Sequence, residues 1–212
     1  MVIAIIGILS GVIYVNFGAS QAQSRDLDRR NDIRQVEIAL ENYRRDNGRY
    51  PLGCNPIFGG VSTSGQPGSS EACTSGSEFY IQNLVPGYIT ELPVDSRAPA
   101  GGGYVYITNN DGSVYKFIAK GSIESQVIQI DDDFASCDYR PSGSGSIRSA
   151  GWCAFAESDS LPDRCTPGND RFDTSIATWS GFAAEADIDT AWLSLSGADR
   201  DAARETMRVI CW

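Results

Sequence analysis

The chain of 212 residues has no histidine, and the residues considered for chemistry are its carboxylates and cysteines. The absence of histidine excludes Ser-His-Asp and Cys-His nucleophiles and every metal site that needs an imidazole ligand. Paired acids such as Glu157 and Asp159 could act as a general acid and base, but nothing in the sequence marks a cleft around them. We therefore expect no enzymatic activity.

Three consecutive carboxylates, Asp131, Asp132 and Asp133, are the candidates for a metal site. Calcium binds several hard oxygen ligands, which these side chains could supply together with Asp138 or backbone carbonyls. The spacing is not that of an EF-hand, and a solvated acidic turn accounts for the same residues. The sequence predicts no cofactor, and calcium at these three residues is the alternative.

Six cysteines are spread widely through segments rich in Gly, Ser and Pro, and none forms a CxxC pair. This spacing does not fit zinc ribbons or thioredoxin-type redox motifs. It fits up to three disulfide bonds, which require an oxidising compartment; buried thiols in a cytosolic core are the alternative. The candidates for disulfide bonds are Cys54, Cys73, Cys137, Cys153, Cys165 and Cys211. Their connectivity is not readable from the sequence.

The formal net charge of −10 is unevenly distributed along the chain. Residues 1–24 carry no charged side chain, residues 25–50 carry seven arginines and six acids, and the remainder carries ten basic and 21 acidic residues. An acidic body repels phosphate backbones, so we expect no direct binding of nucleic acid. The arginines of the basic segment could contact anionic lipid headgroups, pair with acids of neighbouring subunits or form a solvated helix face. They are Arg25, Arg29, Arg30 and Arg34.

The first fifteen residues are apolar except for Ser10 and the Tyr14 hydroxyl. A helix of fifteen residues reaches only about 22 Å, whereas the hydrocarbon core of a bilayer is about 30 Å thick. A secretory signal peptide needs a basic residue before the apolar run, and none precedes it here. The remaining interpretation is an apolar helix that begins earlier and continues into the following polar residues.

That continuation has the pattern of an amphipathic helix. From Asp26 to Asn47 the chain has no Pro or Gly, and its apolar residues recur at helical spacing. Gly48 can adopt the left-handed conformation of a helix C-cap and Pro51 prevents resumption, so we expect the helix to end near Asn47. If it is continuous from Val2, it has about 45 residues and is about 68 Å long. The residues expected to pack against the rest of the protein are Ile33, Val36, Leu40 and Tyr43.

A helix of this length is too long for its own domain to cover. A domain of this size has a radius of gyration of about 17 Å. The apolar half of the helix must therefore protrude, and bare apolar side chains need lipid or other copies of themselves as surroundings.

Two segments of this helix resemble the N-terminal region of type IV pilins and type II secretion pseudopilins. They are VIAIIGILSGVIY at residues 2–14 and DIRQVEIALENYRRDNGRYP at residues 32–51. YITELPVD at residues 88–95 is similar to a segment of pseudopilin heads, with residues 104–106 as the strand that follows. The leader, its peptidase-site glycine and the glutamate of the first turn are absent from the sequence. We therefore expect Met1 to be an internal start.

The resemblance implies a structural subunit that crosses the cytoplasmic membrane once and then moves into a type IV pilus or type II secretion filament, at the cell surface or in the periplasm. It implies four kinds of partner: copies of the chain, membrane lipid before assembly, an inner-membrane assembly platform and a prepilin peptidase. Gly7 and Gly11 have the GxxxG spacing that permits close helix packing. The residues expected in filament or membrane packing are Val2, Ile3, Ile5, Ile6, Gly7, Leu9, Gly11 and Ile13.

Two other classes of protein remain open. The first is a secreted, disulfide-tied binding or adhesion domain released by signal-peptide cleavage near Ala22. The second is a hydrolase with acidic catalytic residues that is anchored by the N-terminal helix. Pilus and secretion pseudopilus are also not separated by these residues.

The residues after the helix have the pattern of a small antiparallel sheet. Residues 104–108 and 114–119 flank Asn109-Asn110-Asp111-Gly112, which predicts a hairpin. We expect a third strand at Gln126–Ile130 and a short helix or turn at Phe79–Val85, packed on the long helix.

The sequence thus predicts an α+β fold: a long N-terminal helical spine packed against a small antiparallel sheet, with a loop-rich, disulfide-tied C-terminal extension, as the resemblance to pilins implies. The expected divisions are an apolar half-helix at 1–24, an amphipathic half-helix at 25–50, a loop-and-sheet head at 51–130 and a cysteine-rich extension at 131–212.

Overall fold

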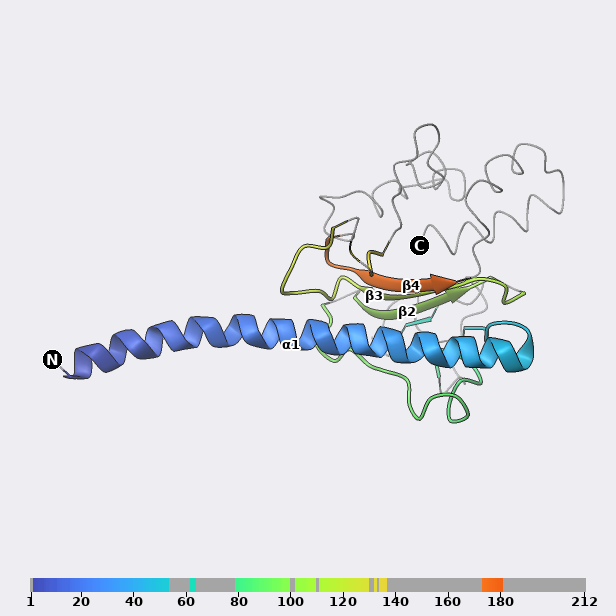
Figure 1. Ribbon diagram of the computed structural model, residues 1–212, viewed down its shortest axis with the longest axis horizontal. Helices are drawn as coiled ribbons and strands as arrows, with labels where there is room; N and C mark the ends of the chain where they lie inside the picture. Colours follow the sequence, from blue (N-terminus) through green and yellow to red (C-terminus); the bar gives the residue numbers. More distant parts are fainter. Residues whose placement is uncertain are drawn as a thin grey trace, which may run out of the picture.

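The computed structural model has one long N-terminal helix and a small antiparallel sheet, an α+β arrangement (Figure 1). It describes residues 2–53, 62–63, 79–99, 102–109, 111–129, 132, 134–136 and 173–180, and of residues 2–17, 62–63 and 180 only the backbone. All six cysteines therefore lie outside the described residues, as do Asp131 and Asp133.

Helix α1 runs without a break from Val2 to Asn47, 46 residues in all. Its length is therefore about 69 Å. The predicted end is confirmed: Gly48 has a φ of 74°, and its N–H donates to the carbonyl of Arg44 at 2.7 Å. Figure 1 shows the second half of α1 lying along the sheet and the first half extending away from it.

The sheet has the strand order β1-β2-β3-β4, with every neighbouring pair antiparallel. The strands are β1 (Ser62–Thr63), β2 (Gly103–Thr108), β3 (Tyr115–Lys120) and β4 (Ile176–Ser180). The predicted hairpin is confirmed as β2 and β3, with Tyr106 opposite Phe117. In its turn, Gly112 has a φ of 70° and donates its N–H to the Asn109 carbonyl.

The strand predicted at Gln126–Ile130 was wrong. Residues 126–129 form no strand, and the position beside β3 is taken by β4, which comes from the range that the sequence assigns to the C-terminal extension. Ile128 in this segment is buried, and its N–H donates to the carbonyl of Asp173 at 2.8 Å. Burial of this one side chain therefore does not require a place in the sheet.

The core lies between α1 and the sheet. Alternate residues of the hairpin strands face the helix, among them Tyr104, Tyr106 and Phe117. Residues of the opposite sheet face, such as Val105 and Ile107, form a second buried cluster, so β2 and β3 are buried on both faces.

The segment 79–99 packs into the core beside the helix. Tyr80, Ile81 and Leu84 are buried in the cluster that contains the helix residues. The predicted turn at residues 79–85 is present at Gln82–Asn83, and a second turn follows in which the N–H of Tyr88 donates to the carbonyl of Leu84. This segment brings Asp95 to the helix, where it takes part in the site described next.

Candidate functional site

Charged side chains gather where α1 leaves the head. Arg29 is only 3% exposed there, although arginine is rarely buried without partners. Its Nε donates to Asp95 Oδ2 at 2.8 Å and its Nη1 to Asp26 Oδ1 at 2.8 Å. Nη1 also lies 2.9 Å from Glu124 Oε1. We call Arg25, Asp26, Arg29, Asp95 and Glu124 the junction cluster.

The other members of the junction cluster tie the helix to the loop after β3. The Asp26 carboxylate accepts hydrogen bonds from the backbone N–H groups of Glu124 and Ser125. Arg25 binds the Glu124 carboxylate through both Nε and Nη2. One turn of α1 is therefore joined to two loops that are far apart in sequence.

The charges of the junction cluster stabilise one another. Hydrogen bonds from Arg25, followed by those from Arg29, lower the pKa of Glu124 from 4.5 to about 2. Burial opposes the charge of Arg29, but its hydrogen bonds to Asp95 and Glu124 outweigh that effect and raise the pKa of its guanidinium. Arg29 is thus held fully charged at the edge of the core.

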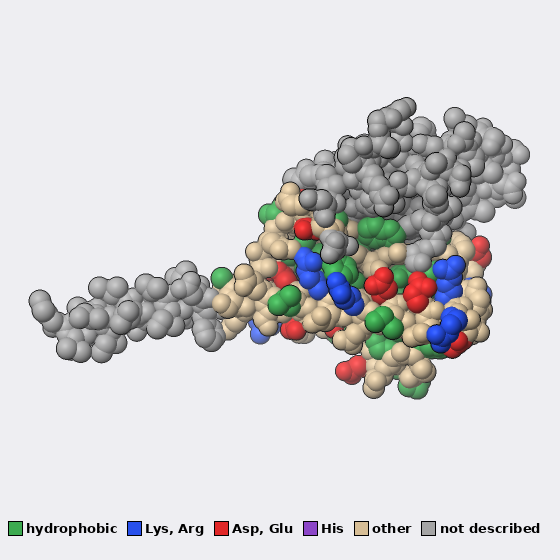
Figure 2. Space-filling model, in the orientation of Figure 1, with side chains coloured by type: hydrophobic (Ala, Val, Ile, Leu, Met, Phe, Trp, Pro, Cys, Tyr) green, Lys and Arg blue, Asp and Glu red, His purple; other side chains and the backbone are tan. Residues whose placement is uncertain are grey.

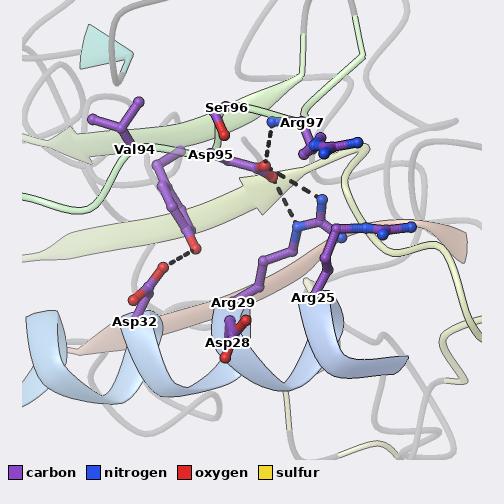
Figure 3. Close-up of a pocket in the computed structure, with 9 residues that line it drawn as sticks. Arg25, Asp28, Arg29, Asp32, Val94, Asp95, Ser96 and Arg97 are labelled. Atoms are coloured by element: carbon purple, nitrogen blue, oxygen red, sulfur yellow. Dashed lines mark hydrogen bonds and ion pairs between the residues drawn. The ribbon is translucent and has the colours of Figure 1, made fainter. Parts of the chain in front are cut away.

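A pocket of about 160 Å³ lies beside the junction cluster. In Figure 3, Asp28 and Asp32 rise from α1, and the turn at residues 94–97 lies above them. The hydroxyl of Tyr104 donates to Asp32 Oδ2 at 2.6 Å. Burial, with the nearby carboxylates of Asp28 and Asp95 in addition, raises the pKa of Asp32.

Two further arginines lie over an aromatic ring of the head. The guanidinium carbons of Arg30 and Arg34 lie 5.6 Å and 5.0 Å from the centroid of Phe134. Both distances are in the range of cation–π attraction. The four arginines of the cluster predicted from the sequence therefore separate into two groups: Arg25 and Arg29 pair with carboxylates, whereas Arg30 and Arg34 contact a ring.

The predicted calcium ligands are only partly described. The Asp132 carboxylate accepts the N–H of Gln129 at 2.9 Å. Within the described part of the chain, no three His, Cys, Asp or Glu side chains gather as a metal site would need. Calcium at Asp131–Asp133 stays a prediction.

The structure places the predicted packing residues as follows. Ile33, Val36 and Leu40 have no exposed surface and Tyr43 is 8% exposed, all in the core cluster. The predicted filament residues from Val2 to Ile13 lie on α1, but their side chains lie outside the described residues. None of the described residues forms a helical stretch long and apolar enough to cross a membrane.

Sequence reasoning missed the junction cluster. It grouped Arg29 with the neighbouring arginines by charge alone. One signal was present: Asp26 and Arg29 have the i,i+3 spacing of a helical ion pair. The partners Asp95 and Glu124 come from loops far along the chain, where no spacing rule applies.

Comparison of the chain with known protein families, with curated protein sequences and with solved structures gives no match.

Proposed function

We propose that this chain is a non-enzymatic structural subunit of the type IV pilin or type II pseudopilin kind, which packs into a filament through its N-terminal helix. The observation that carries the proposal is the projection of α1 beyond the head (Figure 1). The head covers only part of this 46-residue helix, and most helical stability in proteins comes from tertiary packing. The uncovered part therefore requires other surroundings to pack against.

The side chains of α1 are buried by the head in its second half and exposed just before it, as expected for a subunit whose first half packs elsewhere. Ile33, Val36 and Leu40 are fully buried, whereas residues 18–24 are exposed except for a half-buried Ala22. The sequence before residue 18 is almost wholly apolar. Leaving it in water would be unfavourable, at about 25 cal/mol for each Å² of apolar surface.

The proposed mechanism is an exchange of surroundings for the apolar half-helix. Before assembly it lies in the cytoplasmic membrane, and afterwards it lies among the same residues of neighbouring copies. Lipid tails and aliphatic side chains are similarly apolar, so the transfer is nearly neutral in hydrophobic free energy. A separate motor can therefore drive assembly reversibly.

The finer features belong to the same proposal. They are the pilin fold, a disulfide-tied extension at residues 131–212, processing by a prepilin peptidase and engagement of an inner-membrane assembly platform. The similarity of residues 2–14, 32–51 and 88–95 to pilins and pseudopilins supports them. The contact that the last of these segments makes with α1 through Asp95 supports only the first of them, the pilin fold.

Substitution at Leu9 tests the packing of the helices. Leu9→Arg places a charge within the apolar half-helix, and we expect folded subunit but no filaments by electron microscopy. Leu9→Ile is the matched control, because it keeps the side chain apolar, and it should assemble. Normal filaments from the arginine variant would refute the packing of apolar half-helices.

Intact-mass measurement on the native protein separates this proposal from a secreted domain. A subunit keeps the apolar half-helix in its mature form. A binding domain released near Ala22 lacks residues 1–22, and a mass with that deficit would end the filament proposal.

A further inference from the structure

Helix α1 carries two pairs of like charges on opposite flanks. Asp28 and Asp32 form one i,i+4 pair, and Arg30 and Arg34 form the other. With about 100° between successive residues, the centres of the two pairs lie about 160° apart around the helix axis. The buried stripe through Ile33 lies between them. We call the pairs the acidic flank and the basic flank.

The basic flank has no carboxylate to bind within the described part of the chain. Arg30 is half-buried and Arg34 is exposed, and both guanidinium groups are held near the ring of Phe134. Two arginines at i,i+4 spacing repel each other. Holding them together on one ring concentrates positive charge, and no ion pair among the described residues engages either guanidinium group.

The acidic flank carries negative charge at the surface of the helix. Asp28 is exposed and Asp32 half-buried, and both line the pocket of about 160 Å³ (Figure 3). The nearest cations of the helix, Arg25 and Arg29, are already bound to Glu124 and Asp95. Arg97, at the rim of the pocket, supplies one positive charge against the two carboxylates. Asp32 accepts the hydroxyl of Tyr104, but no ion pair among the described residues engages Asp28 or Asp32.

We propose that the basic flank of one copy docks on the acidic flank of the next copy, with Arg34 of the first facing Asp28 of the second. Such a contact joins two different surfaces, so it repeats from copy to copy and generates an open helical array. This inference rests on the proposed function and names the partner surface for the body of the subunit.

A second copy is the occupant that the charges favour. The two flanks have matched numbers of opposite charges and lie at similar heights on the same helix, and both border the head, one at the turn of residues 94–97 and the other at Phe134. The face in Figure 2 likewise carries basic and acidic side chains in adjacent groups. Complementary charges of this kind set register and partner choice more than they set affinity.

Charge reversal at the two most exposed members tests the contact. In the full-length chain, Arg34→Glu makes the basic flank neutral overall, and Asp28→Arg does the same to the acidic flank. For each variant expressed alone in the native host, we expect sedimentable filament to fall about tenfold, because the substituted side chain then meets a like charge at every contact. Subunit amount and helical circular dichroism of the extracted protein should be unchanged.

Mixing the two variants gives the sharpest outcome. The glutamate introduced at position 34 of the first variant then faces the arginine introduced at position 28 of the second. The other contact joins the unaltered basic flank of the second variant to the unaltered acidic flank of the first, so alternating filaments should recover. The double variant in a single chain should recover as well. Arg45→Glu is the control, because Arg45 is exposed and pairs with the adjacent Asp46, and it should assemble normally.

The outcomes separate this inference from the proposal on which it rests. Filaments from the single variants at the wild-type level, or a loss that mixing does not repair, would overturn the pairing of flanks. A loss of membrane association by Arg34→Glu without rescue would point to lipid headgroups and also overturn it. If the unaltered chain makes no filaments, the proposed function itself fails.

Discussion

At the scale of single residues, the position of Arg29 is the least expected feature of the molecule. It is buried among three carboxylates, two of which come from distant loops. Removing it would leave Asp26 and Asp95 charged at the edge of the core. Breaking a buried ion pair in this way usually costs more than the pair contributes.

We expect Arg29→Met to lower the free energy of unfolding by about 3 kcal/mol. The measurement is urea unfolding of the full-length chain in mild detergent. Arg45→Met is the matched control on the same helix, and its exposed pair should change stability by less than about 0.5 kcal/mol. Equal effects from the two variants would show that the junction cluster does not hold the head on the helix.

The low pKa of Glu124 predicts a dependence of stability on pH. Its carboxylate has a pKa of about 2 in the fold against 4.5 ordinarily. The unfolded chain therefore takes up the proton first, so the stabilisation is complete above about pH 5 and disappears as the pH falls toward 2. In Glu124→Gln, unfolding free energy measured against pH should fall less steeply over this interval. If the dependence of the unfolding free energy on pH is the same in Glu124→Gln and in the unaltered chain, the acid sensitivity comes from other carboxylates.

The sequence could predict the packing side of α1 but not the junction cluster. Ile33, Val36 and Leu40 follow the period of a helix with one face buried and the other in water. The partners of Arg29 are set by how two loops return to the helix. No local pattern contains that information.

At the scale of elements, the turn between β2 and β3 also positions the end of α1. The carbonyl of Gly112 accepts the N–H of Tyr50 at 2.8 Å, just after the helix. A Cβ on Gly112 would lie 2.5 Å from the carbonyl oxygen of Tyr50, and its φ of 70° disfavours other residues. The hairpin and the helix exit therefore depend on the same glycine.

Gly112→Ala should destabilise the protein by about 2 kcal/mol, because strain at a positive φ adds to the close approach. Thermal unfolding would report the change. Gly87→Ala serves for comparison, since a Cβ there meets nothing within 4 Å and the φ is not positive, and it should be nearly neutral. A neutral Gly112→Ala would mean that the turn adjusts without disturbing Tyr50.

The elements that sequence reasoning found are those with strong local signals. Gly48 and Pro51 define the helix end, and the Asn-Asn-Asp-Gly turn defines the hairpin. Strand β4 has no comparable signal, because Ile176–Ser180 is short and lies far from the hairpin in sequence. The segment 126–129 gave a false signal because β-branched residues such as Val127 and Ile128 favour strands, whereas Ile128 is buried here outside the sheet.

At the scale of the whole molecule, the covered and uncovered parts of α1 should differ in local stability. We expect the amides of residues 19–24 to exchange hydrogen faster than those of residues 33–43 in detergent-dispersed subunits, since only the latter are packed under the sheet. Mass spectrometry after deuterium exchange measures both. In assembled filaments the first group should become slow. Slow exchange of both groups before assembly would count against an uncovered half-helix.

The late position of β4 has a consequence for biosynthesis. Residues 121–175 must be made before Ile176–Ser180 can join β3. A nascent or prematurely terminated chain thus carries a finished hairpin with an unpaired edge, a surface that invites aggregation and proteolysis. Synthesis of Ile176–Ser180 therefore covers an edge of β3 that shorter chains leave open.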